Sequence, residues 1–276
     1  MPDRSRKSAF PTRQAVALGL LQGPTELLPV SSSAHTALLP WLLGWNYSQL
    51  DPELRKSFEV ALHGAAGLAL AIDMRSELLQ EASGMDARRA AAIACSLAPA
   101  AIAGCALRGA IERRLGGPRS IAAGLGIGGV AMALADARRA EPARTLEEAR
   151  PRDGLALGLA QAIALIPGVS RSGATLTAAR ARGFARADAQ TLSWHAALPV
   201  LLGVGALEGA RLARSGAPAG ARRVLAAGAV SAFASTLASA RALRRRPPAL
   251  LPWSVYRCAL ALIVIRRLRR AHNGGR

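Results

Sequence analysis

Aromatic residues and cysteines are scarce in this chain of 276 residues. Phe, Trp and Tyr together make up 4% of the sequence, too few for the stacking platforms on which single-stranded nucleic acids bind. The three cysteines, Cys95, Cys105 and Cys258, lie in apolar surroundings without the spacing of a metal site. We therefore expect neither a disulfide framework nor a cysteine-bound metal, and we interpret the cysteines as reduced packing residues.

Acidic residues are also in the minority, because 17 Asp and Glu stand against 36 Lys and Arg, for a net charge of +19. Such an excess is typical of nucleic-acid-binding proteins. The positive residues are nearly all arginine, however, and they are clustered between largely uncharged stretches: 90–107, 120–135, 191–207 and 250–265. Stretches of that length suit helices that cross a bilayer, with arginines at their ends near anionic headgroups. We predict an integral membrane protein that does not bind nucleic acid.

The period-2 alternation that marks half-buried strands is missing, so we predict an all-α, polytopic fold. Spanning helices are expected near 58–75, 89–108, 119–136, 189–210, 222–243 and 249–266. Segments 44–52 and 210–221 are expected to be surface loops. No small-residue cleavage site follows the basic N-terminus, which we interpret as a retained cytoplasmic start.

A faint internal repeat divides the sequence. Residues 18–22 (LGLLQ) are echoed by 157–161 (LGLAQ), and a proline and a serine-rich turn follow each. We predict one membrane domain built from two related halves, about 14–136 and 153–270, joined by a charged connector. Short apolar segments interrupted by Gly and Pro at matching positions indicate inverted repeats with two re-entrant helical hairpins. Irregular backbone at that depth is tolerated where it lines a cavity.

The first polar motif, QGPTELLPVSSSAH, occupies residues 22–35. Gln22 and Glu26 are four residues apart, so they share one helix face. Pro29 should break that helix, and serines 31–33 are natural N-cap residues for the next one. A helix N-terminus inside a cavity is a ready anion site.

Ser32 and His35 are three residues apart, which places hydroxyl and imidazole on one face of the second helix. A serine nucleophile needs this pairing, because an unassisted hydroxyl is weak at neutral pH. The alternative is that the serines only cap the helix and that His35 is a satisfied core histidine.

The second motif, PGVSRSGAT, occupies residues 167–175. Pro167 should end a helix, while Gly168 and Gly173 would let the backbone approach a ligand closely. Arg171 keeps its charge when buried, and its planar fork matches phosphate oxygens. The hydroxyls expected to bind substrate with it belong to Ser31, Ser170, Ser172 and Thr175. The alternative is a turn in which Arg171 pairs structurally with Glu26.

Together the two motifs, G-x-T-E-x-x-P-x-S-S-x-x-H and P-G-x-S-R-S-G-A-T, resemble the bacitracin-resistance family of undecaprenyl-diphosphatases. The likeness extends to 58–60, Pro199, Pro252 and 256–257, and so covers almost the whole chain. The resemblance implies a multi-pass enzyme of the bacterial inner membrane with an outward-facing site. Such enzymes hydrolyse undecaprenyl diphosphate to undecaprenyl phosphate and phosphate, which recycles the lipid carrier for cell-wall synthesis. They confer resistance because bacitracin sequesters the diphosphate.

The positions that match the family's catalytic and phosphate-binding residues are Glu26, Ser32, His35, Ser170, Arg171 and Thr175. One position departs from the pattern, because the family usually carries a second glutamate where this chain has Gln22. Two carboxylates could hold Mg²⁺ or Ca²⁺, whereas an amide ligates without charge. We expect a divalent cation at Glu26 and Gln22, and the substitution puts that dependence in question. His63 is expected to be a supporting or structural residue.

Several alternatives stay open at this point. His35 would deprotonate Ser32 or a water, and Glu26 would orient His35, bind the cation or protonate the leaving group. Inverted repeats with a midplane anion site are also transporter architecture, so the alternative function is a polyprenyl-phosphate carrier without hydrolysis. The expected partners are the polyprenyl diphosphate, the bilayer and, for a homodimer, a second copy of the chain.

Overall fold

A computed structural model of the chain describes residues 10–138, 143–215, 221–245 and 249–273. Over these residues the chain forms helices and no strand, apart from one isolated bridge between Arg144 and Phe184. The α-helices are α1 (Thr12–Leu27), α2 (Ser32–Leu42), α3 (Pro52–Asp73), α4 (Arg75–Ser83), α5 (Ala87–Leu115), α6 (Pro118–Ala137), α7 (Pro151–Ile163), α8 (Arg171–Ala181), α9 (Arg186–Ser215), α10 (Arg222–Arg245) and α11 (Leu250–Asn273). The predicted all-α class is confirmed.

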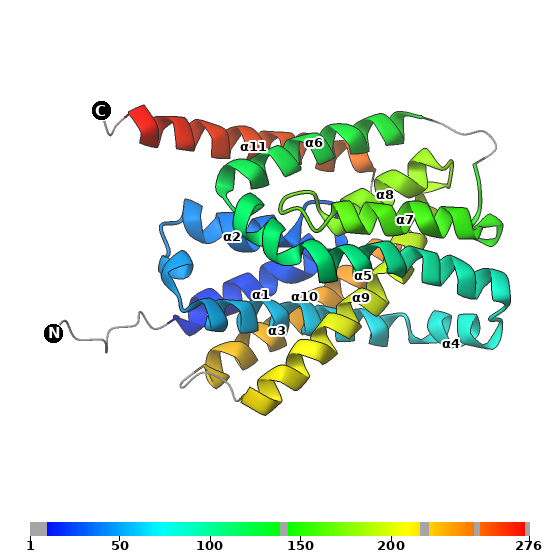
Figure 1. Cartoon of the computed structure of the whole chain (residues 1–276), viewed down its shortest axis with the longest axis horizontal. Helices are drawn as coiled ribbons and strands as arrows, with labels where there is room; N and C mark the ends of the chain where they lie inside the picture. The colour runs from blue at the N-terminus through cyan, green and yellow to red at the C-terminus, as the bar shows by residue number, and fades with distance from the viewer. Residues whose placement is uncertain (1–9, 139–142, 216–220, 246–248, 274–276) are drawn as a thin grey trace. The chain divides into compact units, whose positions relative to one another are not determined.

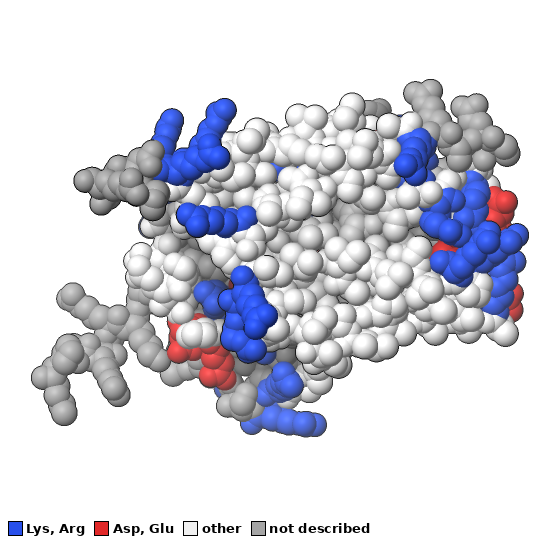
Figure 2. Space-filling view, turned by 45° about the horizontal axis from the view of Figure 1, so that its top comes forward, with Lys and Arg blue, Asp and Glu red and all other residues white. Residues whose placement is uncertain are grey.

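Among the described residues, four helices are long and apolar enough to cross a membrane: Ala87–Leu107, Pro118–Ala137, Arg186–Arg211 and Arg222–Leu243. They coincide with four of the six predicted spans. The other two, 58–75 and 249–266, are helical as parts of α3 and α11 but are not among the four. Only 6% of the apolar window in α5 is buried, and Figure 2 shows a broad uncharged surface with charged groups gathered at its margins. A surface of this kind suits contact with lipid.

The contacts divide the chain into two compact units. The first unit comprises Met1–Leu27, His35–Leu79 and Leu198–Arg245, and the second comprises Leu28–Ala34, Gln80–Ala197 and Arg246–Arg276. Each unit therefore combines early and late parts of the sequence. In the first, α1 lies beside α10, as the blue and orange helices show in Figure 1.

Small residues bring α1 and α10 together in the first unit. A Cβ at Gly19 or Gly23 would collide with the backbone of α10. The hydroxyl of Ser235 then completes the contact, because it accepts the Gly23 N–H at 3.1 Å and donates to the Gly19 carbonyl at 3.0 Å. Close glycine contacts of this type are usual between membrane helices, and here they fix the helix that carries the first motif.

The two predicted surface loops turned out differently. Segment 44–52 contains a 3-10 helix (Asn46–Gln49), and its Tyr47 and Leu50 are buried at 4% and 6% exposure beside Phe10 and Phe58. The aromatic rings explain the difference, since they pack into the core in spite of the polar neighbours. At the other segment, α9 continues to Ser215, and 216–220 lie outside the described residues.

In the second unit, α7 packs on α5 through Gly154 and Gly158, where a Cβ would meet backbone of α5. The buried carboxylate of Asp153 at the start of α7 pairs with Arg144 at 2.8 Å and Arg182 at 2.7 Å. Burial alone would raise the pKa of Asp153, but the hydrogen bonds from these two arginines hold it well below its usual value. The ionised carboxylate thus ties the connector to the end of α8.

Candidate functional site

The first elbow, residues 28–31, joins α1 to α2. Helix α1 ends at Leu27 and α2 begins at Ser32, so the predicted break at Pro29 is confirmed. Ser31 has a φ of 75°, which is uncommon for a residue with a side chain and costs backbone energy. Its buried hydroxyl accepts the N–H of Ala34 at 3.4 Å. The predicted serine cap is therefore present, and it is Ser31.

The second elbow, residues 164–170, joins α7 to α8. Helix α7 ends at Ile163, four residues earlier than the break predicted at Pro167. The reason is local: Pro167 has no N–H to bond the carbonyl four residues earlier, that of Ile163, and its ring would clash with that carbonyl. Ser170 has a φ of 68°, and its hydroxyl accepts the N–H of Gly173 at 3.1 Å.

The two elbows share one local geometry. Among the described residues, Ser31 and Ser170 are the non-glycine positions with positive φ. In each elbow the serine hydroxyl lies 3.3 Å from the hydroxyl two residues later. Both serines directly precede a helix, so both helix N-termini are capped in the same way. These N-termini are the positions at which backbone N–H groups and the helix dipole favour an anion.

Contacts within the second unit join the elbows directly. The Ser172 hydroxyl donates to the Leu28 carbonyl at 2.9 Å. Arg257, a residue of α11 with 0% exposure, lies against both elbows and donates to carbonyl oxygens of each. This position lies within 256–257, part of the likeness to the family, but no role in the site was predicted for Arg257. The available signal was a single arginine inside the otherwise uncharged stretch 250–265.

The glycines of the second motif serve these protein contacts. A Cβ at Gly168, whose φ is 93°, would collide with the Ile121 carbonyl. A Cβ at Gly173 would collide with the guanidinium of Arg257. We had predicted that both glycines admit a ligand, and in the structure protein groups fill the space beside them.

The remaining substrate-binding candidates lie on or beside α8. Arg171 is its first residue and is half-buried. Thr175 is fully buried, and its hydroxyl contacts the Arg171 carbonyl at 2.9 Å and the Ser193 hydroxyl at 2.7 Å. The Thr175 side chain therefore fixes the first turn of α8 to α9, and the sequence had given no indication of Ser193.

The first unit holds the acidic part of the first motif. Gln22 and Glu26 are buried, and the Gln22 Nε2 donates to the Glu26 Oε2 at 3.0 Å, which confirms their common helix face. His63 of α3 places Nε2 3.5 Å from the same carboxylate oxygen. Its Nδ1 lies 2.7 Å from the Glu59 carbonyl. Because a carbonyl only accepts, Nδ1 carries a proton, which leaves Nε2 to face Glu26.

Gln22 and Glu26 supply part of the set of oxygen ligands that a hard cation requires. The buried Gln22 Oε1 has no hydrogen-bond partner within the part of the chain that the structure describes, which is the state expected of an oxygen available for a ligand. The Glu26 carboxylate is adjacent and supplies negative charge. Among the described residues, no three His, Cys, Asp or Glu side chains gather as a metal site. The fit therefore depends on one carboxylate and one amide oxygen.

Helix α2 carries the nucleophile candidates. Ser32 is half-buried and His35 is buried, and both lie in its first turn. Their spacing of three places them on one side of the helix. The predicted helix is confirmed, and the pairing of hydroxyl and imidazole stays a prediction.

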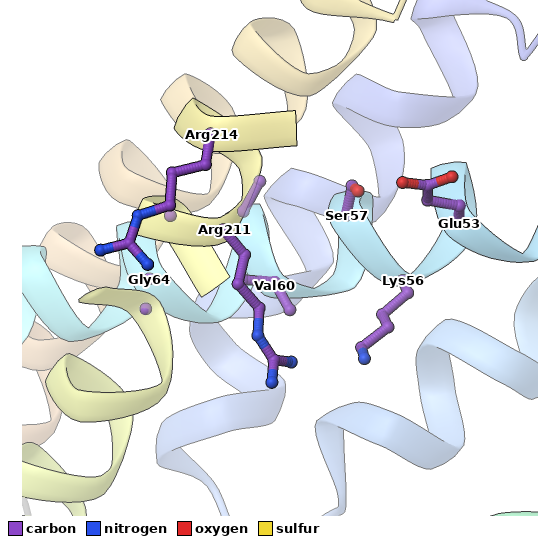
Figure 3. A pocket seen from close by; sticks show the side chains of 10 residues that line it. Glu53, Lys56, Ser57, Val60, Gly64, Arg211 and Arg214 are labelled. Carbon is purple, nitrogen blue, oxygen red and sulfur yellow. The ribbon is translucent and has the colours of Figure 1, made fainter. Parts of the chain in front are cut away.

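A separate cleft of about 520 Å³ lies between α3 and α9 in the first unit (Figure 3). Lys56, Arg211 and Arg214 line it together with small residues that include Gly64 and Gly205. None of the predicted site residues lines this cleft. Arg211 and Arg214 lie at the end of the candidate span Arg186–Arg211, which fits arginines near anionic headgroups.

Comparisons with known proteins agree with this description. The family model described as "Bacitracin resistance protein BacA" matches residues 15–263. An undecaprenyl-diphosphatase of Geobacter sulfurreducens is 42% identical over 243 residues, covering 83% of this chain and 88% of that protein. Those of Thermomicrobium roseum and Pelotomaculum thermopropionicum are 37% and 33% identical and cover 91% and 93% of this chain, and 96% and 97% of their own lengths. With four candidate spans among its described residues, this multi-pass membrane protein belongs to the BacA bacitracin-resistance family.

Proposed function

We propose that this protein hydrolyses undecaprenyl diphosphate to undecaprenyl phosphate and inorganic phosphate. The family match over residues 15–263 carries the proposal, together with relatives named undecaprenyl-diphosphatase. We place the enzyme in the bacterial inner membrane, where its product would return to the carrier pool for cell-wall synthesis. Removal of the diphosphate that bacitracin sequesters would give resistance. A homodimer stays a prediction.

The capped N-termini of α2 and α8 support binding of the diphosphate. Each presents backbone N–H groups beside a serine of positive φ. Arg171, at the first position of α8, would hold the oxygens of the transferred phosphoryl group through its planar fork. Charge spreads over these oxygens in the transition state, so fixed donors lower the barrier.

For the chemical step, we propose that Ser32 attacks the terminal phosphorus. Its Oγ forms the new P–O bond while the bridging P–O bond breaks, and undecaprenyl phosphate leaves with the bridging oxygen. His35 would accept the hydroxyl proton. Water would then hydrolyse the phosphoserine and release phosphate. A water activated by His35 would give the same products in one step.

The side-chain oxygens of Gln22 and Glu26 would hold a divalent cation, and His63 contacts the Glu26 carboxylate. When bound, Mg²⁺ or Ca²⁺ would supply positive charge at this cluster. Gln22 lacks the charge of the family's glutamate, so we expect weaker binding of the cation here. Glu26 would also keep His35 or the leaving group in the correct protonation state.

Phosphate release from undecaprenyl diphosphate by purified protein in detergent tests the proposal. We expect steady release with the diphosphate and none with undecaprenyl phosphate, because only the former holds a phosphoanhydride bond. A chelator should slow the reaction. A protein that moves the lipid across vesicles but releases no phosphate, with or without added cation, would instead be the carrier of the alternative function.

Replacing Gln22 by glutamate should preserve or raise turnover and tighten cation binding on the order of tenfold, because a second carboxylate adds charge to the ligand set. Chelator titration of the activity and cation binding to the purified protein would measure this. Gln80→Glu, at an exposed glutamine, is the matched control. A sharp loss of activity in Gln22→Glu at saturating cation would show that the pair does not bind the ion.

A further inference from the structure

Arg257 of α11 is a buried charged residue that has no role in the proposed chemical step. Its side chain is fully buried in the otherwise uncharged first part of α11. Its five hydrogen bonds to described residues all go to backbone carbonyl oxygens, one from Nε, one from Nη1 and three that share the two hydrogens of Nη2. A guanidinium has five N–H donors in a fixed plane. The acceptors are Pro29 in the first elbow, Gly168 and Val169 in the second, and Gly124 and Leu125 in α6, at 2.8 to 3.2 Å.

These acceptors lie next to the two strained serines. Pro29 is two residues before Ser31, and Val169 directly precedes Ser170. A bond to a carbonyl fixes the orientation of its peptide plane, so Arg257 constrains the backbone that leads into both positive-φ turns. Glycines leave room for the guanidinium, since a Cβ at Gly128 or Gly173 would collide with it.

The positive charge of Arg257 is a second observation that links this residue to an anion at the elbows. None of its five partners is a carboxylate; each contributes only the partial charge of a peptide oxygen. A buried cation without a counter-ion is costly. An anion beside the elbows would supply the missing negative charge, and the capped N-termini of α2 and α8 are where an anion is favoured.

We propose that Arg257 is the positioning residue that locks the first and second elbows together, and that its positive charge strengthens their affinity for the substrate diphosphate. This inference rests on the proposed function, because it assigns Arg257 to the same diphosphate. Arg257 acts through the backbone of the elbows and need not touch the substrate.

Two variants separate the role of the planar guanidinium group of Arg257 from the role of its positive charge. Arg257→Lys keeps a cation but cannot reach carbonyls in three segments at once, so kcat should fall about tenfold with a smaller change in KM. Arg257→Ala removes both, so kcat should fall about 10²-fold and KM should also rise. Guanidinium ion at tens of millimolar should restore activity to Arg257→Ala, whereas ammonium should not, because only guanidinium reproduces the fork.

The experiment compares phosphate release by these variants with wild type and with Arg266→Ala, an exposed arginine of the same helix that should behave as wild type. Thermal unfolding in detergent verifies that each variant is folded; if Arg257→Ala does not fold, Arg257→Lys carries the test. Wild-type kcat in Arg257→Lys, or a folded Arg257→Ala that guanidinium does not rescue, would overturn the inference. Absence of phosphate release by wild-type protein would instead overturn the proposed function.

Discussion

Replacing Arg171 by alanine should lower the rate of phosphate release about 10³-fold. Arg171 opens α8 directly after the strained Ser170, so the elbow that positions its guanidinium is built from backbone that alanine does not disturb. The variant loses a charged, two-pronged donor to the transferred phosphoryl group, a loss of about 4 kcal/mol in transition-state stabilisation. The side chain of Arg171 is only half-buried, so we expect insertion and thermal stability to stay close to wild type.

Turnover of purified protein at saturating substrate, together with membrane extraction yields, would measure this. Arg223→Ala removes an exposed arginine at the start of α10 and is the matched control. Wild-type turnover in Arg171→Ala would show that the second motif has no part in catalysis. Equal losses in both variants would point to a general effect of surface charge.

Replacing Glu26 by glutamine should reduce turnover about 10²-fold or more. The two side chains have nearly the same shape, so the packing of α1 on α10 should survive. The change removes the buried negative charge that contacts Gln22 at 3.0 Å and His63 at 3.5 Å. Whether Glu26 binds the cation or controls a proton, each role requires its carboxylate.

The control is Glu53→Gln, which neutralises an exposed carboxylate at the start of α3. Cation binding measured on the inactive variant separates the two roles: lost binding indicates a ligand, and retained binding with lost turnover indicates proton transfer. Full activity in Glu26→Gln would mean that the family's first motif works without its charge in this chain.

Much of the local structure could be predicted from the residues. Proline removes a donor and serine supplies a cap, so the break between α1 and α2 was visible in the sequence. The break before α8 was predicted from Pro167, four residues after the end of α7. The spacing of four between Gln22 and Glu26 likewise fixed their common face, which their hydrogen bond confirms. Apolar length located the four candidate spans. Segment 44–52 was predicted to be a surface loop because of its polar residues, but its Tyr47 and Leu50 are buried.

By itself the sequence determined the helical class, the apolar spans and the first break at Pro29, because these depend on neighbours within one or two turns. Tertiary structure decided which distant groups meet. Arg257 and Pro29 are 228 residues apart, yet packing of α11 and the first elbow in one unit joins them. His63 reaches Glu26 because α3 packs near α1. Such pairings follow from how helices pack against each other, and no short-range pattern encodes them.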